Sequence, residues 1–226
     1  MNWSQALIDY KHYLQIERGL SVNSISNYGL DIEKLIRFLE DKSLRVSPIS
    51  IDAETVQQFV YEVAKNMNPR SQARIISGLK SFFNFLVFEE YRKTNPLELI
   101  ESPKLGRKLP DTLSVKEIDA LINAIDASSP EGTRNKAMLE TLYCCGLRVS
   151  ELVSLKLSDL FFQEGFVKVT GKGNKQRLVP SAKSCEKLLA IYIKEVRNHL
   201  TIAKGHEDFV FLNRRGKQLT RAMVFT

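Results

Sequence analysis

The sequence predicts a mostly α-helical protein with a small antiparallel β-sheet in its second half. Apolar residues recur every three or four positions through most of the first half, which is the spacing of amphipathic helices. After about residue 160 the pattern changes to short runs of β-branched and aromatic residues between glycine-containing turns. A stretch with Pro103, Pro110 and few bulky apolar residues separates the two patterns, as a linker does. We therefore expect a helical domain at 1–101, a linker at 102–113 and an α+β domain at 114–226.

The first domain is expected to be a bundle of four helices with short connections. The second helix begins after a cap at Ser21 or Asn23, the third after a cap at Asp52, and the fourth runs from Pro69 to about Arg92. Four apolar stripes are assigned to its core: Trp3, Leu7, Tyr10 and Leu14; Ile25, Tyr28, Ile32, Leu35 and Leu39; Val56, Phe59, Val60 and Val63; and Ile76, Leu79, Phe83 and Leu86.

The second domain begins with helices and continues with strands. Ser114 followed by Glu117 predicts a helix start with the reciprocal hydrogen bonds of a capping box. Glycine-containing turns after residue 163 and at 171–174 predict hairpins of an antiparallel sheet. The remaining expected elements are helices at 130–144, just after residue 146 and at 182–200, and strands at 161–162, 165–170, 176–179 and 209–212.

Positive charge is concentrated in the second predicted domain. The chain has 33 Lys and Arg against 26 Asp and Glu, a net charge of +7. Residues 1–105 hold 13 of each sign, so the whole excess lies in residues 106–226. An excess of this kind favours a polyanionic partner, although basic enzymes of several classes share it.

Cysteine and histidine usage argues against other classes of site. Cys144, Cys145 and Cys185 are odd in number and lack C-x-x-C spacing, so neither a disulfide framework nor a structural zinc site is expected. The three histidines are scattered along the chain, and we expect no metal and no cofactor. The sequence shows neither a signal-peptide pattern nor an apolar run near the roughly 20 residues of a membrane helix. We expect a cytoplasmic protein that does not contact a membrane.

Two helices of the first domain begin with polar side chains that suit contact with nucleic acid. Short hydroxyl and amide groups and arginines at a helix start can bond to phosphate oxygens or base edges. The alternative is that they cap the helices and cover a solvated face. The residues predicted to contact DNA here are Ser24, Asn27, Arg70, Ser71, Arg74 and Lys80.

The segment CCGLRVSEL at residues 144–152 carries the first candidate for chemistry. Gly146 predicts a turn that places Arg148 at a helix start, where a guanidinium can receive an anionic oxygen. Glu151, one helical turn later, is expected to hold that guanidinium through a side-chain hydrogen bond. The alternative is an ordinary intrahelical ion pair of small value.

The segment VTGKGNKQRLVP at residues 169–180 carries the second candidate. It predicts a hairpin whose tip presents Lys172 and Lys175, with Arg177 on the returning strand. Such a tip can enter a groove or reach a phosphate, and we predict that Lys175 and Arg177 contact DNA. The alternative is a solvated surface turn. A nucleotide-binding loop is not expected, because the G-x-x-x-x-G-K-[ST] order is absent.

Together and in this order, the two segments resemble the tyrosine recombinase (phage integrase) family, in particular the XerC/XerD type that resolves chromosome dimers. SVNSISNYGLDIEKLIRFL at 21–39 is similar to a helix of the family's N-terminal SAM-like, core-binding domain. LPDTLSVKEIDALI at 109–122 is similar to the start of its catalytic domain. The resemblance covers the whole chain.

The resemblance implies the reaction and the roles of three residues. Members cut DNA through a 3′-phosphotyrosine and rejoin it without ATP or metal. By match of motif, Arg148 stabilises charge on the transition state, Lys172 is the general acid for the leaving 5′-oxygen, and Glu151 is the supporting acid. The expected partners are double-stranded DNA with inverted half-sites, identical or sister subunits in a tetramer, and a DNA translocase. The expected setting is the nucleoid, in chromosome partition at cell division.

The remaining catalytic motifs of the family do not occur in this sequence. We find no His-x-x-Arg pair and no tyrosine in the context of the nucleophile. Tyr143 is near Arg148 in sequence, but its neighbours Leu139 and Leu142 predict that it packs in the core. The expectation is therefore that residues 114–226 are the N-terminal part of a catalytic domain, and that this chain alone does not cleave DNA.

Two other functions stay open at this point. One is a non-catalytic DNA-binding module or a fragment of a transposon or phage integrase. The other is an RNA-binding protein, which the absence of RRM or KH signatures disfavours.

Overall fold

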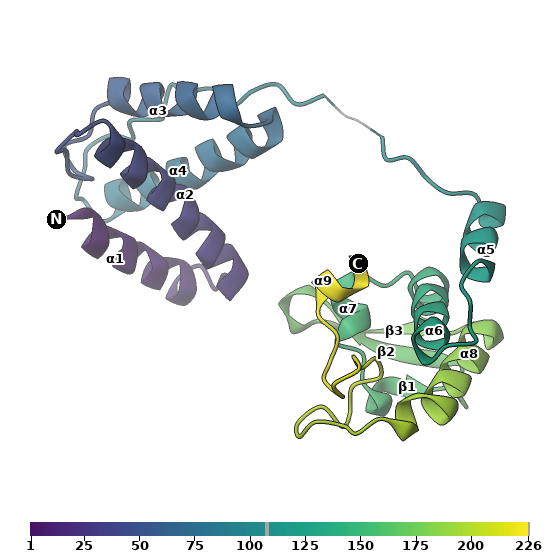
Figure 1. Cartoon of the computed structure of the whole chain (residues 1–226). Helices are drawn as coiled ribbons and strands as arrows, with labels where there is room; N and C mark the ends of the chain where they lie inside the picture. The colour runs from purple at the N-terminus through teal and green to yellow at the C-terminus, as the bar shows by residue number, and fades with distance from the viewer. Residues whose placement is uncertain (107–108, 226) are drawn as a thin grey trace. The chain divides into compact units, whose positions relative to one another are not determined.

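The computed structural model describes residues 1–106 and 109–225, and the chain divides into two compact units, Met1–Leu109 and Pro110–Thr226 (Figure 1). Each unit has a hydrophobic core of its own. The two units are therefore described separately.

Helices are the only regular secondary structure in the described part of the first unit, residues 1–106 and 109. Its helices are α1 (Trp3–Ile16), α2 (Val22–Asp41), α3 (Ala53–Asn66) and α4 (Pro69–Phe88). Each begins after a short polar residue whose side chain accepts a hydrogen bond from the backbone N–H three positions later, which satisfies one of the donors a helix start leaves free. These capping residues are Asn2, Ser21, Asp52 and Asn68.

The predicted apolar stripes form the core of this unit. Tyr10 lies at its centre, edge-on to Phe82 at a centroid distance of 5.3 Å, and its hydroxyl bonds to Ser81. The fourth helix ends at Phe88, four residues earlier than predicted, because Glu90 adopts a left-handed conformation with φ of 60°. Arg92 lies beyond the helix, and its guanidinium donates to the carbonyls of Pro48 and Ile51.

The second unit combines helices with a small sheet. Within the described residues 109–225 the sheet has the order β1-β2-β3 and is antiparallel throughout. Its elements in order are α5 (Val115–Asn123), α6 (Pro130–Cys145), α7 (Val149–Val153), η1 (Leu157–Asp159), β1 (Leu160–Phe161), β2 (Phe166–Thr170), η2 (Lys172–Asn174), β3 (Gln176–Pro180), α8 (Lys183–Glu195), η3 (Arg197–His199) and α9 (Arg221–Phe225). The predicted fold class, mostly α with a small antiparallel sheet, is confirmed.

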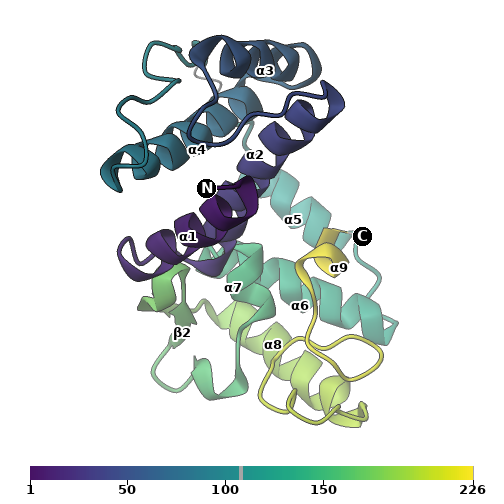
Figure 2. The ribbon, with the colours of Figure 1, turned by 90° about the vertical axis from the view of Figure 1, so that its left-hand side faces the viewer.

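Helices α6 and α8 lie side by side in this unit (Figures 1 and 2). They share one core with the inward-facing residues of β2, Val167 and Val169. The capping box predicted at the start of α5 is present, because Ser114 and Glu117 exchange side-chain hydrogen bonds with each other's backbone N–H. In the described part of the chain, no helix combines the length and the apolarity needed to span a membrane.

The strand predicted at residues 209–212 is wrong. Phe209 and Leu212 each form only an isolated bridge, with Lys156 and Gln218 respectively. The run is apolar because it is buried beneath α8, where Phe211 stacks on Tyr192 at 5.5 Å. Burial explains the composition, and strand pairing is not needed for it.

The helix predicted at 182–200 is shorter than expected. Helix α8 ends at Glu195, because Val196 has non-helical torsion angles of −123° and −60°. Arg197 then turns inward and donates to the carbonyls of Phe209 and Glu207. A buried arginine needs hydrogen-bond acceptors, and a continuous helix through residue 200 would not place Arg197 near these carbonyls.

The predicted burial of Tyr143 is also wrong. Its side chain is 43% exposed, whereas Leu142 next to it packs against the core. The apolar face of α6 instead passes through Ala137, Met138 and Cys145. At about 100° per residue, residue 143 lies on the opposite face of the helix from these positions, so it points away from the core.

Candidate functional site

Arg148 is placed by the turn between α6 and α7. Gly146 ends α6 in the left-handed conformation with φ of 55° and ψ of 41°, which glycine adopts without the strain that a side chain would introduce. Leu147 is buried, and its N–H donates to the carbonyl of Leu142. Arg148 follows in an extended conformation as the capping residue of α7, with its side chain 70% exposed.

Glu151 is the buried centre of the site, with only 4% of its surface exposed. Its Oε2 accepts a hydrogen bond from the backbone N–H of Arg148 at 2.9 Å, and its Oε1 accepts one from Arg148 Nη1 at 2.8 Å. The predicted hydrogen bond between Glu151 and the guanidinium is therefore confirmed. Arg148 is held on one edge, and its other donors face outward with the exposed side chain.

Arg177 is the second cation bound to Glu151. Its Nη1 donates to Oε1 at 2.8 Å and its Nη2 to Oε2 at 2.9 Å, which is the two-point geometry of a strong Arg–carboxylate pair. These bonds, and after them the bonds from Arg148, hold the pKa of Glu151 at about 2, well below its ordinary value, although burial opposes this. The carboxylate is therefore ionised throughout the physiological pH range.

Sequence reasoning placed Arg177 with the DNA contacts and missed this ion pair. The signal that could have found it is the hairpin register, in which Arg177 is opposite Val169. Residues opposite each other in an antiparallel pair share one face of the sheet, and Val169 is buried. Arg177 must therefore lie on the inward face, whereas Lys175 precedes β3 in the turn and is exposed.

Lys172 and Lys175 lie in the tip that joins β2 to β3. The tip is a short 3-10 turn, Lys172–Asn174, with Gly173 in the left-handed region and a hydrogen bond of 2.8 Å from the N–H of Gly171 to the carbonyl of Lys175. Both lysines are exposed. A Cβ added to Gly171 would stand only 3.1 Å from Glu151 Oε1, so the base of the tip packs directly on the Glu151 carboxylate.

The predicted contact residues of the first unit divide into free and engaged side chains. Arg74 donates from Nη1 and Nη2 to the buried carboxylate of Asp31, so its fork is partly occupied. Ser24 shares a hydrogen bond of 3.0 Å with Ser21 at the start of α2. Arg70 and Asn27 are exposed, and Ser71 and Lys80 are half-buried.

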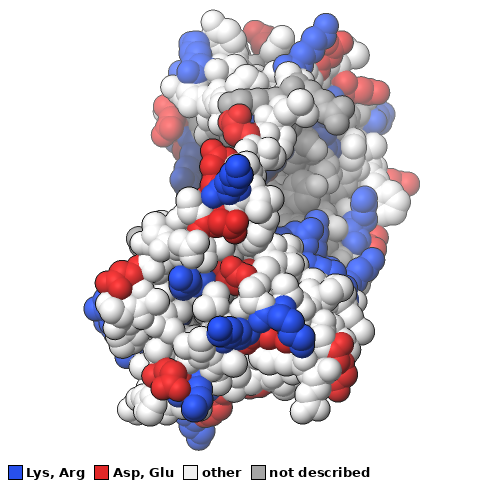
Figure 3. Space-filling view, turned by 90° about the vertical axis from the view of Figure 1, so that its right-hand side faces the viewer, with Lys and Arg blue, Asp and Glu red and all other residues white. Residues whose placement is uncertain are grey.

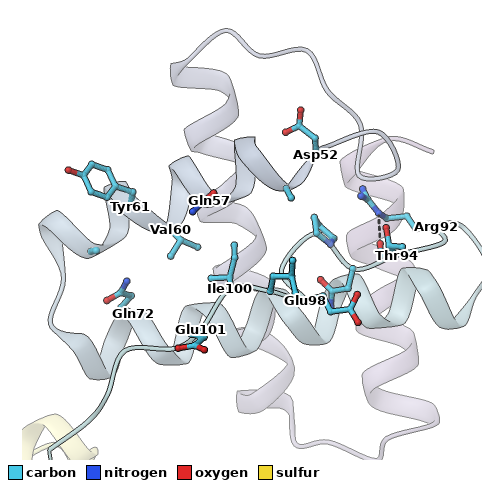
Figure 4. Close-up of a pocket in the computed structure, with 15 residues that line it drawn as sticks. Asp52, Gln57, Val60, Tyr61, Gln72, Arg92, Thr94, Glu98, Ile100 and Glu101 are labelled. Carbon is cyan, nitrogen blue, oxygen red and sulfur yellow. Dashed lines mark hydrogen bonds between the residues drawn. The ribbon is translucent and has the colours of Figure 1, made fainter.

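A shallow pocket of about 770 Å³ lies elsewhere in the first unit, between α3 and residues 92–101 (Figure 4). Tyr61 and Glu101 are among its lining residues, and none of the predicted site residues line it. Figure 3 shows basic and acidic side chains interspersed over the face that it draws. Within residues 1–106 and 109–225, no group of three or more His, Cys, Asp or Glu side chains is placed to hold a metal ion.

Comparison with known proteins identifies the two units. Residues 7–90 match the profile of the phage integrase N-terminal SAM-like domain, and residues 111–226 match that of the phage integrase family. The chain belongs to the phage integrase family of tyrosine recombinases. The resemblance predicted from the two motif segments is thereby confirmed.

Relatives within this family are named XerD. The chain is 38% identical to the tyrosine recombinase XerD of Listeria innocua over 214 residues, which is 94% of this chain and 72% of the relative. It is 40% identical to the XerD of Oceanobacillus iheyensis over 217 residues, which is 96% of this chain and 73% of the relative.

Solved structures of integrases share the fold at low sequence identity. A lambda integrase dimer bound to a COC′ core site matches with a TM-score of 0.74 and 19% identity, over 99% of this chain and 78% of that one. XerH recombinase bound to palindromic difH matches with a TM-score of 0.71 and 22% identity, over 91% of this chain and 61% of that one. These likenesses confirm the fold class predicted for both domains.

Proposed function

We propose that this chain acts in site-specific DNA recombination and that the Glu151 cluster, with the Lys172 tip beside it, is where it binds the scissile phosphate. The supporting observation is the arrangement of Arg148 and Arg177 on one buried carboxylate that also touches Gly171. A guanidinium held along one edge keeps its remaining donors pre-aimed, which is how an enzyme stabilises developing negative charge without reorganisation.

Three residues have roles in the proposed reaction. In the reaction that the family resemblance implies, a tyrosine hydroxyl loses its proton to water and attacks the phosphorus, and the bond from phosphorus to the 5′-oxygen breaks. Arg148 neutralises charge on the phosphoryl oxygens, Lys172 gives its proton to the leaving 5′-oxygen, and Glu151 supports Arg148. In the rejoining step a 5′-hydroxyl attacks the phosphotyrosine, the same lysine removes its proton, the bond from phosphorus to the tyrosine oxygen breaks, and that oxygen takes up a proton from water.

The names of the relatives support a finer proposal, chromosome-dimer resolution on DNA with inverted half-sites. The two relatives described above are named XerD. One matched structure is described as a lambda integrase tetramer bound to a Holliday junction, and another as XerH on a palindromic substrate. By analogy we propose a tetramer of this chain with identical or sister subunits, and a DNA translocase as a further partner.

The DNA contacts of the first unit remain part of the proposal. Arg70 and Asn27 present exposed side chains, as does Lys175 in the hairpin tip of the second unit, which suits contact with phosphates. Ser24, Ser71, Arg74 and Lys80 are also proposed as contacts. Arg74 would use only the donors that Asp31 leaves free.

We further propose that the 226-residue chain binds its site without forming a covalent adduct. Of the two tyrosines of the second unit, Tyr192 is fully buried and its hydroxyl accepts the N–H of Leu212 at 3.2 Å. Tyr143 is exposed on α6, but its sequence context does not match the nucleophile. These observations also favour the second candidate function, a non-catalytic DNA-binding module.

A suicide-substrate assay tests this proposal. A nicked duplex that carries inverted half-sites traps any phosphotyrosine intermediate as a protein–DNA adduct. We expect a shifted complex on a native gel and no adduct under denaturing conditions. A covalent adduct that forms with the wild-type chain under denaturing conditions, but not with Tyr143→Phe, would identify Tyr143 as a nucleophile and overturn the proposal.

A competition assay tests the DNA preference that the proposed recombination function requires. Duplex DNA with inverted half-sites should displace a labelled duplex at lower concentration than structured RNA or a scrambled duplex does. Equal competition by all three would leave only non-specific electrostatic binding.

A further inference from the structure

The carboxylate of Glu151 has its hydrogen-bonding capacity filled. It accepts four hydrogen bonds: one from the backbone N–H of Arg148, one from the side chain of Arg148 and two from the side chain of Arg177. A carboxylate offers about four acceptor positions. Each oxygen of Glu151 therefore accepts one hydrogen bond from Arg148, at the start of α7, and one from Arg177, on β3. We call this set of bonds the junction.

Arg177 contributes the part of this junction that fixes β3. Its two parallel bonds define both the position and the plane of the carboxylate, which the single ammonium of a lysine cannot do. The side chain is 39% exposed, compared with 70% for Arg148. The more enclosed arginine carries the two-point contact, and the more exposed one keeps donors free.

Gly171 extends the junction to the tip of the hairpin. A Cβ at this position would meet Glu151 Oε1 at 3.1 Å and Arg177 Nη1 at 3.3 Å. Its backbone is extended, with φ of −101°, so the requirement for glycine comes from space and not from conformation. Lys172 is the next residue, so the backbone that carries it is packed on the Glu151–Arg177 pair.

We infer that Arg177 is a positioning residue, which acts through Glu151 and Gly171 to fix the Lys172 tip relative to Arg148. The inference rests on the proposed function, since it assumes that the two cations serve one phosphate. It assigns to Arg177 a different task from the DNA contact expected from sequence. In the wild-type protein the junction fixes the position of Lys172. A weakened junction makes the tip more mobile and leaves the surface charge unchanged.

Two variants test the inference, because both keep the net charge. Arg177→Lys retains a cation but loses the two-point contact, and Gly171→Ala places a methyl group against the ion pair. Lys175→Ala is the matched control, since it removes an exposed cation from the same tip. Thermal unfolding of each variant verifies that it is folded before further measurement, and Gly171→Ala keeps the test open if Arg177→Lys does not fold.

The first readout is the order of the tip in the free protein. Backbone ¹⁵N relaxation at residues 171–175 should show lower order parameters in Arg177→Lys and Gly171→Ala than in wild type and in Lys175→Ala. The ¹³C titration of the Glu151 carboxyl should move upward from its wild-type midpoint in Arg177→Lys. A merely stabilising role would lower the unfolding temperature and shift the Glu151 titration but leave the order parameters of residues 171–175 unchanged, and that outcome would overturn the inference.

The second readout is the salt dependence of binding to a duplex with inverted half-sites. Lys175→Ala should reduce the slope of log K against log salt by about 0.9, as expected for one lost phosphate contact. Arg177→Lys and Gly171→Ala should retain the wild-type slope. A slope lowered in Arg177→Lys as much as in Lys175→Ala would show a direct phosphate contact and refute the positioning role. Because tip order is measured without DNA, failure of the proposed function would not be mistaken for failure of this inference.

Discussion

Arg74 of α4 and Asp31 of α2 form a two-point ion pair in the first unit, with Nη1–Oδ2 at 2.6 Å and Nη2–Oδ1 at 2.7 Å. Asp31 is only 1% exposed. A Cβ added to Gly78 of α4 would stand 2.5 Å from Asp31 Oδ2. Glycine therefore leaves the space in which the carboxylate approaches the neighbouring helix.

The first prediction concerns that space. Gly78→Ala should lower the free energy of unfolding of the first unit, because overpacking of about 1–3 kcal/mol exceeds the gain of about 1 kcal/mol that alanine brings to a helix. Gly29→Ala is the control, since its Cβ would crowd the flexible end of Lys11 and meet Leu7 only at ordinary contact distance. We expect that control to be neutral or stabilising in urea unfolding. Equal destabilisation by both substitutions would contradict this account.

The second prediction concerns the charge of Asp31. Burial raises the pKa of Asp31 above its ordinary value, and the hydrogen bonds from Arg74 oppose that rise. Arg74→Ala removes the opposing bonds and raises this pKa further. Because a raised carboxyl pKa costs stability once the group must ionise, the loss should grow as the pH rises from 4 to 7. We expect about 1–3 kcal/mol at pH 7, since Arg74 is half-exposed.

Urea unfolding at a series of pH values checks the second prediction. Combining Asp31→Asn with Arg74→Ala should abolish most of the pH dependence, because the group that titrates is then absent. A loss of stability in Arg74→Ala that stays constant from pH 4 to 7 would exclude Asp31 as its cause.

The third prediction concerns Glu151 in acid. Its folded pKa of about 2 lies below its ordinary value of 4.5, so its ionised form stabilises the folded state. That stabilisation is complete above pH 4.5 and is lost as the pH falls towards 2, with a slope of at most about 1.4 kcal/mol per pH unit. Glu151→Gln should remove this part of the acid dependence. Glu164→Gln, at an exposed turn, should not change it.

The fourth prediction separates the two tyrosines of the second unit. Tyr192→Phe leaves the buried N–H of Leu212 without its acceptor and should cost about 1–3 kcal/mol in the free energy of unfolding. Tyr143→Phe should change stability by less than about 0.5 kcal/mol, because its side chain is exposed. Denaturant unfolding monitored by circular dichroism measures both. A larger loss of stability in Tyr143→Phe would contradict the exposed position of Tyr143 and support the burial predicted from sequence.

Local signals in the sequence predicted much of the fold. The caps at Ser21 and Asp52 and the capping box at Ser114 are confirmed, because a cap depends on residues within one helical turn. The hairpin from Phe166 to Pro180 is confirmed for the same reason, since its turn is short and rich in glycine.

Features that depend on tertiary contacts were harder to predict. The apolar run at 209–212 has the composition of a strand, and only its burial against Tyr192 distinguishes it from one. The bond between Glu151 and Arg148 spans three positions and could be predicted. The bonds between Glu151 and Arg177 join residues 26 positions apart, so the hairpin register can place Arg177 on the inward face but cannot identify Glu151 as its partner. Periodicity alone assigned Tyr143 to the wrong face, because the core stripe of α6 is narrow.

The return of residues 208–210 to the segment before β1 has a consequence for the order of folding during synthesis. Val210 donates to the carbonyl of Leu155, and Leu157 to that of Asp208, so the second core closes over a loop of about fifty residues. Among the described residues, the core of the first unit contains none beyond Ile100. That unit can therefore fold as soon as it emerges from the ribosome. The apolar core residues of the second unit stay exposed to solvent until Leu219, which belongs to that core, has been synthesised. Slow translation of residues 150–219 would prolong that exposure, and chaperone dependence should follow the second unit alone.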